Sequence, residues 1–117
     1  MHLWIKGPDR NVGLAIRAFV NDRVVSKLSR VSKMVRSIVI SIRDVNGPRG
    51  GIDHVIRVIV RLTSGGKIVV RHRAADAFVG TPIAVRRAVR AVRRELGRRR
   101  SNRRQAYRRN LIAQVRY

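Results

Sequence analysis

Arginine side chains recur at helical spacing near the C-terminal end of the sequence. They recur at spacings of three, four and seven or eight residues: Arg86, Arg90, Arg93, Arg94 and Arg98. In an α-helix such a pattern makes much of one surface guanidinium. Planar guanidinium binds phosphate oxygens through paired N–H donors. A solvated helix face normally mixes charges of both signs, but Glu95 is the only acid after Asp76. The pattern therefore favours phosphate binding.

The whole chain carries the same imbalance. Its 117 residues include 28 Lys and Arg but only six acids, for a formal net charge of +22. Self-repulsion at this charge destabilises a compact state unless a polyanion neutralises it, and RNA is the natural candidate. An anionic membrane would also attract the chain, but the apolar faces of its helices are expected to form a globular core. An arginine-rich composition alone would explain the preference for Arg over Lys, not the scarcity of acids.

Two further basic groups accompany this helix face. The first runs from the end of a predicted helix into the next strand: Lys27, Arg30, Lys33 and Arg36. It would flank a common groove if the two helices lay side by side. The second is predicted on an open sheet face, where phosphate binding and simple solubility explain it equally well: Arg57, Arg61, Lys67, Arg71 and Arg73.

Trp4 is the one aromatic residue predicted on the sheet and is expected at a buried or edge position. RNA is therefore expected to be recognised by shape and phosphate.

Catalytic chemistry has no support in the sequence. His2, His54 and His72 fall on three different predicted strands, which disfavours a metal site. There is no cysteine and no HExxH, GxSxG or P-loop spacing. We therefore expect no enzyme activity, no cofactor and no small-molecule substrate. No apolar run is long enough for a membrane span and no secretory signal is visible, so a cytoplasmic location without membrane contact is expected.

The hydrophobic pattern predicts an α+β fold. Alternation predicts strands over residues 2–6, 35–43, 53–62 and 67–73. A first helix is expected from an N-cap at Asn11 to about Leu28 or Val31, with an apolar face that includes Phe19. A second helix is expected from Thr81 and Pro82 to about Arg98. The order β-α-β-β-β-α predicts a four-stranded sheet with both helices packed on one face. Residues 1–98 form the predicted domain, and residues 99–117 a flexible basic tail that is disordered or helical only on RNA.

One loop carries a resemblance to a known family. The run from Arg43 to Asp53, Arg-Asp-Val-Asn-Gly-Pro-Arg-Gly-Gly-Ile-Asp, is followed by an alternating strand. It resembles the ribosome hibernation promoting factor family, which includes ribosome-associated inhibitor A. The segment from Ala74 to Phe78 is similar to the family's approach to its last helix. The resemblance covers about residues 1–98.

The resemblance implies a function. Members of this family occupy the messenger and transfer RNA channel of the small ribosomal subunit, block initiation and preserve idle ribosomes in stress or stationary phase. By position, the residues implied to face ribosomal RNA are Lys27, Arg30, Lys33, Arg86, Arg87, Arg90, Arg93, Arg94 and Arg98. The chain resembles the short type, without a C-terminal dimerisation domain, so a monomer that does not pair ribosomes is expected. Thr81-Pro82 departs from the family's uninterrupted helix.

Two other functions remain open from the sequence. A general double-stranded RNA-binding protein or RNA chaperone would have a broadly similar layout of helices and sheet. A constitutive ribosomal protein could thread the Arg-rich tail into ribosomal RNA.

Overall fold

The computed structural model describes residues 2–7, 10–45 and 53–115, apart from the side chains of 10–13, 25, 114 and 115. Its elements are β1 (His2–Lys6), α1 (Arg10–Leu28), a 3₁₀ helix η1 (Ser29–Met34), β2 (Val35–Asp44), β3 (His54–Leu62), β4 (Lys67–Ala74) and α2 (Ala77–Val115). The loop that carries the family resemblance lies mostly in 46–52, outside the described residues. The predicted order β-α-β-β-β-α is confirmed.

The four strands form one mixed sheet in the order β1-β2-β3-β4. β1 runs parallel to β2, and the other neighbouring pairs are antiparallel. Gly65 and Gly66 connect β3 to β4 with φ values of 99° and 88°, a left-handed conformation that glycine adopts without steric cost. These two glycines therefore allow the tight turn between the two strands.

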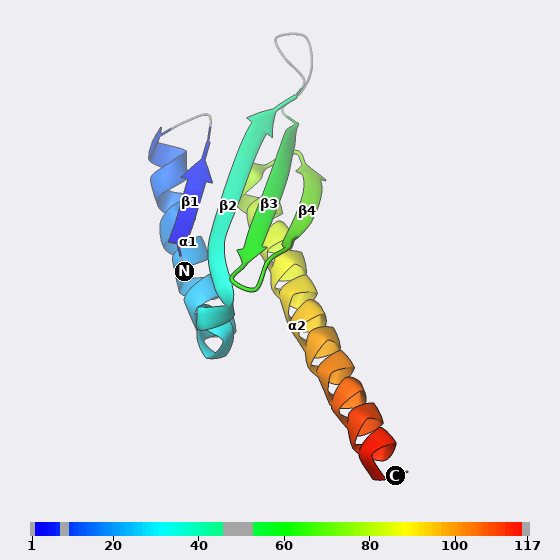
Figure 1. The fold of residues 1–117 in the computed structure, drawn as a ribbon. Coiled ribbons are helices and arrows are strands. Elements are labelled where there is room, and N and C mark those ends of the chain that lie inside the picture. Colours follow the sequence, from blue (N-terminus) through cyan, green and yellow to red (C-terminus); the bar gives the residue numbers. More distant parts are fainter. Residues whose placement is uncertain (1, 8–9, 46–52, 116–117) are drawn as a thin grey trace.

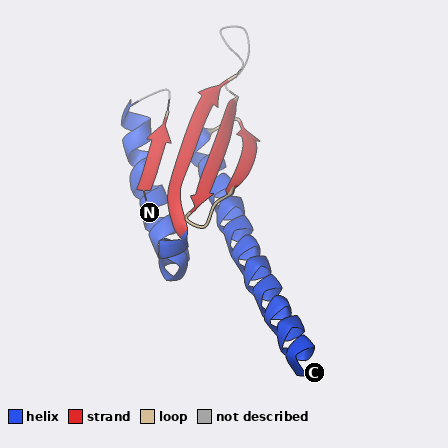
Figure 2. Ribbon diagram, in the orientation of Figure 1, coloured by secondary structure: helices blue, strands red, loops and turns tan. Residues whose placement is uncertain are grey.

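Both helices cover the same face of the sheet, as the sequence predicts (Figures 1 and 2). α1 contacts β1, whereas α2 contacts β3 and β4. Alternate residues of the strands point into a single apolar core between the sheet and the helices. The fully buried side chains at its centre include Val20, Val24, Leu28, Ile38, Ile40, Ile56, Val58, Val60 and Val92. None of the described helices covers the opposite face of the sheet (Figure 2).

The first helix differs from its predicted pattern at one aromatic residue. Ile16, Val20 and Leu28 are buried as expected, but Phe19 is 38% exposed. The prediction that Phe19 belongs to the core is therefore wrong. Phe19 lies one residue away from Val20 around the helix, so it falls on the edge that turns toward α2 rather than toward the sheet. The helix also begins at Arg10, before the N-cap predicted at Asn11.

The second helix begins one turn earlier than predicted. The Asp76 carboxylate accepts a hydrogen bond of 2.8 Å from the Phe78 backbone N–H, which is the geometry of an N-cap. Thr81, predicted as the cap, is instead buried inside the helix, and Pro82 also lies within it. Asp76 is a better N-cap than Thr81, because its carboxylate also interacts favourably with the positive end of the helix dipole.

The same helix also ends later than predicted. It continues past Arg98 to Val115, for 39 residues, and its last part extends away from the sheet (Figure 1). Arg is a strong helix former, and a single glycine costs only about 1 kcal/mol, so Gly97 does not end the helix. Whether residues 99–117 are flexible stays a prediction.

Gly80 is a point of close contact between α2 and the sheet. A Cβ atom at this position would lie 2.5 Å from Ile56 Cδ1 and 2.6 Å from Ala74 Cβ. Ile56 is fully buried and cannot move aside without disturbing the core. The absence of a side chain at Gly80 therefore sets how closely the helix packs.

Gly80→Ala should lower the free energy of unfolding by about 1–3 kcal/mol, the usual cost of overpacking a core. Gly97 is the matched control, because an added Cβ there meets nothing within 4 Å. Gly97→Ala should raise the free energy of unfolding by about 0.5–1 kcal/mol through helix propensity alone. Denaturant unfolding followed by circular dichroism measures both changes. Equal effects of the two substitutions would contradict the close packing at Gly80.

Candidate nucleic-acid interface

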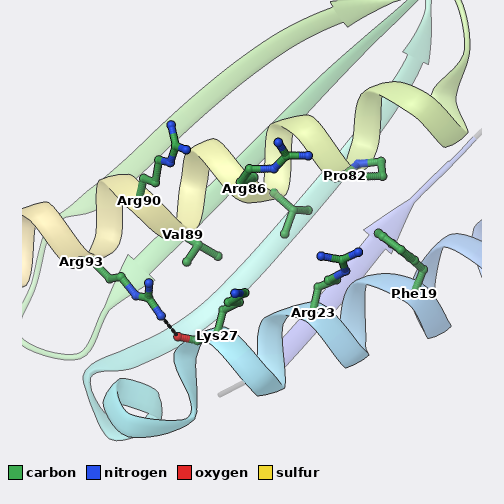
Figure 3. Close-up of a pocket in the computed structure, with 9 residues that line it drawn as sticks. Phe19, Arg23, Lys27, Pro82, Arg86, Val89, Arg90 and Arg93 are labelled. Atoms are coloured by element: carbon green, nitrogen blue, oxygen red, sulfur yellow. Dashed lines mark hydrogen bonds between the residues drawn. The ribbon is translucent and has the colours of Figure 1, made fainter.

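The two helices bound a shallow groove on the side of the molecule away from the sheet. Its hollow has a volume of about 370 Å³. The lining comes from both helices (Figure 3): Phe19, Arg23 and Lys27 of α1, and Pro82, Val85, Arg86, Val89, Arg90 and Arg93 of α2. The sequence predicted a common groove on the condition that the helices lie side by side. The structure meets that condition.

The floor of the groove is apolar and its rim is cationic. Phe19, Pro82 and Val89 provide the apolar surface. The guanidinium of Arg23 lies 5.1 Å from the centre of the Phe19 ring, within cation–π range. Phe19 thereby holds Arg23 at the rim of the groove.

Arg93 ties the two helices together at one end of the groove. Its guanidinium donates a hydrogen bond of 2.8 Å to the backbone carbonyl of Lys27, in the last turn of α1 (Figure 3). The carbonyls of a last helical turn have no partner within the helix, so this bond satisfies one of them. Arg93 therefore has a structural role as well as a cationic one.

Positive charge in the groove is not balanced by acids. Among the described residues, no carboxylate lines the hollow, and no ion pair involves Arg86 or Arg90. Because guanidinium and ammonium groups only donate hydrogen bonds, the rim is suited to an anion with several oxygens. A rim of donors alone fits phosphate oxygens and the acceptor edge of guanine, but it cannot accept hydrogen bonds from the amino groups of adenine and cytosine. The geometry therefore favours phosphate over the reading of a base sequence.

The predicted RNA-facing residues divide into two sets. The groove brings together Lys27, Arg86, Arg90 and Arg93. The others lie outside its lining: Arg30, Lys33, Arg87, Arg94 and Arg98.

Three of the outlying residues have positions that explain the division. Arg87 donates a hydrogen bond of 2.9 Å to the backbone carbonyl of Arg71, so it reaches toward the edge strand β4. Arg30 and Lys33 are exposed on η1, beyond the end of α1. Their part in RNA binding stays a prediction.

Sequence reasoning missed Arg23 and Phe19 as groove residues. The signal was present, since Phe19, Arg23 and Lys27 follow one another at steps of four. Residues at this spacing share a helix face. Periodicity alone does not show on which side the second helix packs, so the sequence did not identify this face as one side of a groove.

A second hollow, of about 420 Å³, marks the point where α2 leaves the body of the protein. Arg99 donates a hydrogen bond of 2.9 Å to the Gly65 carbonyl and another to the Ser64 hydroxyl, which fastens the helix to the β3–β4 turn. Glu95 accepts hydrogen bonds from Arg98 and Arg99, and these lower the pKa of Glu95. Arg99 thus helps to position the helix, whereas Arg98 is paired with Glu95 within the helix itself.

The arginine row of the groove continues along the extended part of α2. Counted from Arg86, the residues Arg90, Arg93, Arg100, Arg104 and Arg108 fall within half a residue of whole helical turns. They therefore share one face, the arginine stripe, which spans about 33 Å at 1.5 Å per residue. Gly97 occupies the remaining turn of the stripe.

No metal-binding group of three or more His, Cys, Asp and Glu is found among the residues that the structure describes. In the same part of the chain, no helix is both long enough and apolar enough to cross a membrane.

Comparison with known proteins gives a structural match. No family model and no curated protein sequence matches the chain. A ribosomal subunit interface protein from Coxiella burnetii has a similar structure, with a TM-score of 0.54 and 17% sequence identity. The similarity covers 86% of this chain and 99% of the other. This likeness establishes a shared fold, which is the fold expected from the family resemblance.

Removal of the two unpaired groove arginines should weaken RNA binding. Arg86→Gln combined with Arg90→Gln removes two contacts that each release about one counterion, so the slope of log affinity against log salt should fall by about 2. Affinity for a fluorescently labelled RNA hairpin, measured by anisotropy, should fall at least about tenfold. Arg103→Gln with Arg109→Gln removes the same charge away from the stripe and should have a much smaller effect. Equal losses in the two variants would mean that net charge alone determines binding.

The stripe should extend the RNA contact beyond the groove. Arg104→Gln with Arg108→Gln should also lower the salt slope by about 2, but only for an RNA long enough to follow α2 for about 33 Å. A short hairpin that fills only the groove should bind the variant and the unaltered protein equally. Anisotropy titrations with the two RNAs separate these cases. An effect that does not depend on RNA length would contradict a continuous track.

Proposed function

We propose that this protein binds the small ribosomal subunit and inhibits translation as a hibernation factor, in the channel used by messenger and transfer RNA. The observation that carries the proposal is the acid-free cationic groove between α1 and α2. A surface of this kind binds closely spaced phosphates, and folded ribosomal RNA presents them at high density.

Two further observations support the ribosome over other RNAs. The chain shares its fold with a ribosomal subunit interface protein, although sequence identity is only 17%. The sequence Asp44–Gly51 resembles that of the hibernation factor family. Both observations are made without reference to the groove, so they support the proposal separately from the charge of its lining.

The mechanism that follows is occlusion. The lining of the groove offers hydrogen-bond donors but no acid–base pair, so the protein is expected to act by occupying space. In the proposed site, Arg86 and Arg90 would bind phosphates directly. Arg93 would keep the helices at the spacing that the RNA requires, through its bond to Lys27.

A general double-stranded RNA-binding protein is the alternative. It is favoured by the lining of the groove, which contains cations and apolar groups but no amide that would read base edges. Such a protein would bind any duplex with similar affinity.

Co-sedimentation with isolated small subunits tests the proposal. The protein should pellet with small subunits, and excess messenger with initiator transfer RNA should displace it, because they would share one site. Arg86→Glu with Arg90→Glu should abolish pelleting, whereas Arg103→Glu with Arg109→Glu, with the same change in charge, should largely retain it. Displacement by duplex RNA, but not by messenger and transfer RNA, would overturn the proposal in favour of the general RNA binder.

A further inference from the structure

The face of the sheet opposite the helices carries an ordered pattern that the proposed function does not use. Four residues are aligned across all four strands: Trp4 with Val39, Val39 with Ile59, and Ile59 with Val69. Trp4 is 61% exposed and Val69 45% exposed. Trp4 was expected at a buried or edge position. It lies on the edge strand β1 but is not buried. The row is an apolar band about 14 Å long, at 4.8 Å per strand.

A basic row flanks the apolar band on each side. On one side the aligned residues are Lys6, Ser41, Arg57 and Arg71, and on the other His2, Ser37, Arg61 and Lys67. Each row lies about 7 Å from the band, because alternate residues of a strand are two rises apart. Neither row contains an acid.

The arrangement of the basic rows lowers the stability of the sheet in the free protein. Arg57 lies directly opposite Arg71, and Arg61 directly opposite Lys67. Like charges opposite each other destabilise a sheet. Arg73, further along β4, is by contrast paired with Asp53. The four cations beside the apolar band appear in no ion pair with a described residue, and a bound anion would relieve their repulsion.

We propose that this open sheet face is a second binding site, which takes a short single-stranded RNA segment. A base stacks on the exposed ring of Trp4, and its neighbours lie on Val39, Ile59 and Val69. The backbone phosphates are held by Arg57, Arg61 and their opposite partners. Stacking on an aromatic ring together with flanking cations is the general way in which single strands are bound without sequence preference. This site goes beyond the proposed function, which uses the helix side.

Charge argues for RNA over other occupants of this face. A second copy of the chain would bring another net charge of +22 against the same arginines. The exposed apolar surface is also narrow, since Val39 and Ile59 are half-buried. A single strand matches both features, because its flat base faces stack on a narrow apolar and aromatic surface while its anionic phosphates meet the cations.

Trp4 supplies a direct reporter, because it is the only tryptophan of the chain. Titration of the full-length protein with a uridine hexamer should quench Trp4 fluorescence saturably. Arg57→Gln with Arg61→Gln should weaken this quenching at least about tenfold without lowering thermal stability. Arg86→Gln with Arg90→Gln, in the helix groove, should leave the quenching unchanged.

A second measurement tests the ring itself. Anisotropy of a labelled hexamer should show at least about tenfold weaker binding to Trp4→Ala, measured in the Arg86→Gln, Arg90→Gln background, and near-normal binding to Trp4→Phe. Binding by anisotropy without quenching of Trp4 would overturn the proposal. So would quenching that disappears in the groove variant but persists in the sheet variant, or a change of Trp4 emission with protein concentration alone. None of these results depends on whether the protein binds small subunits.

Discussion

The packing of α1 and α2 on one face of the sheet is the interaction on which the rest of the molecule depends. It gathers many apolar residues of a short chain into one core and, among the side chains that the structure describes, leaves every Lys and Arg outside it. The free-energy cost of burying one unpaired charge is far larger than the free energy gained by burying one apolar side chain. The cations are therefore confined to the outer sides of the helices and to the open face of the sheet.

This confinement has an electrostatic consequence. Cations at helical spacing in α2, and opposite one another in β3 and β4, repel each other in the free protein. Anything that binds the folded state alone stabilises it by mass action. A polyanion on either surface therefore contributes to folding as well as to binding, and the small core suffices for a chain with a net charge of +22.

Much of this architecture could be predicted from the sequence, because the strands alternate strictly and each helix has an apolar stripe. The predictions failed where the pattern carries no information. An arginine-rich segment has no apolar periodicity that would distinguish a helix from a disordered tail. The sequence therefore did not predict that α2 ends at Val115. Periodicity placed Phe19 near the core but could not show that it faces the second helix. The groove depends on a relation between two helices far apart in sequence, so only part of its lining, Lys27, Arg86, Arg90 and Arg93, was predicted.

The two proposed surfaces differ in chemistry because they are built on different elements. Helices place arginines at turns of about 5.4 Å, a rigid row of donors that suits the phosphates of a folded RNA. The sheet places an apolar row between two cationic rows, which suits exposed bases. Since the sheet and core separate the surfaces, RNA on one does not obstruct the other. A folded RNA and a single strand could thus be held together by one small domain, an arrangement suited to a site where structured RNA borders a path for single-stranded RNA.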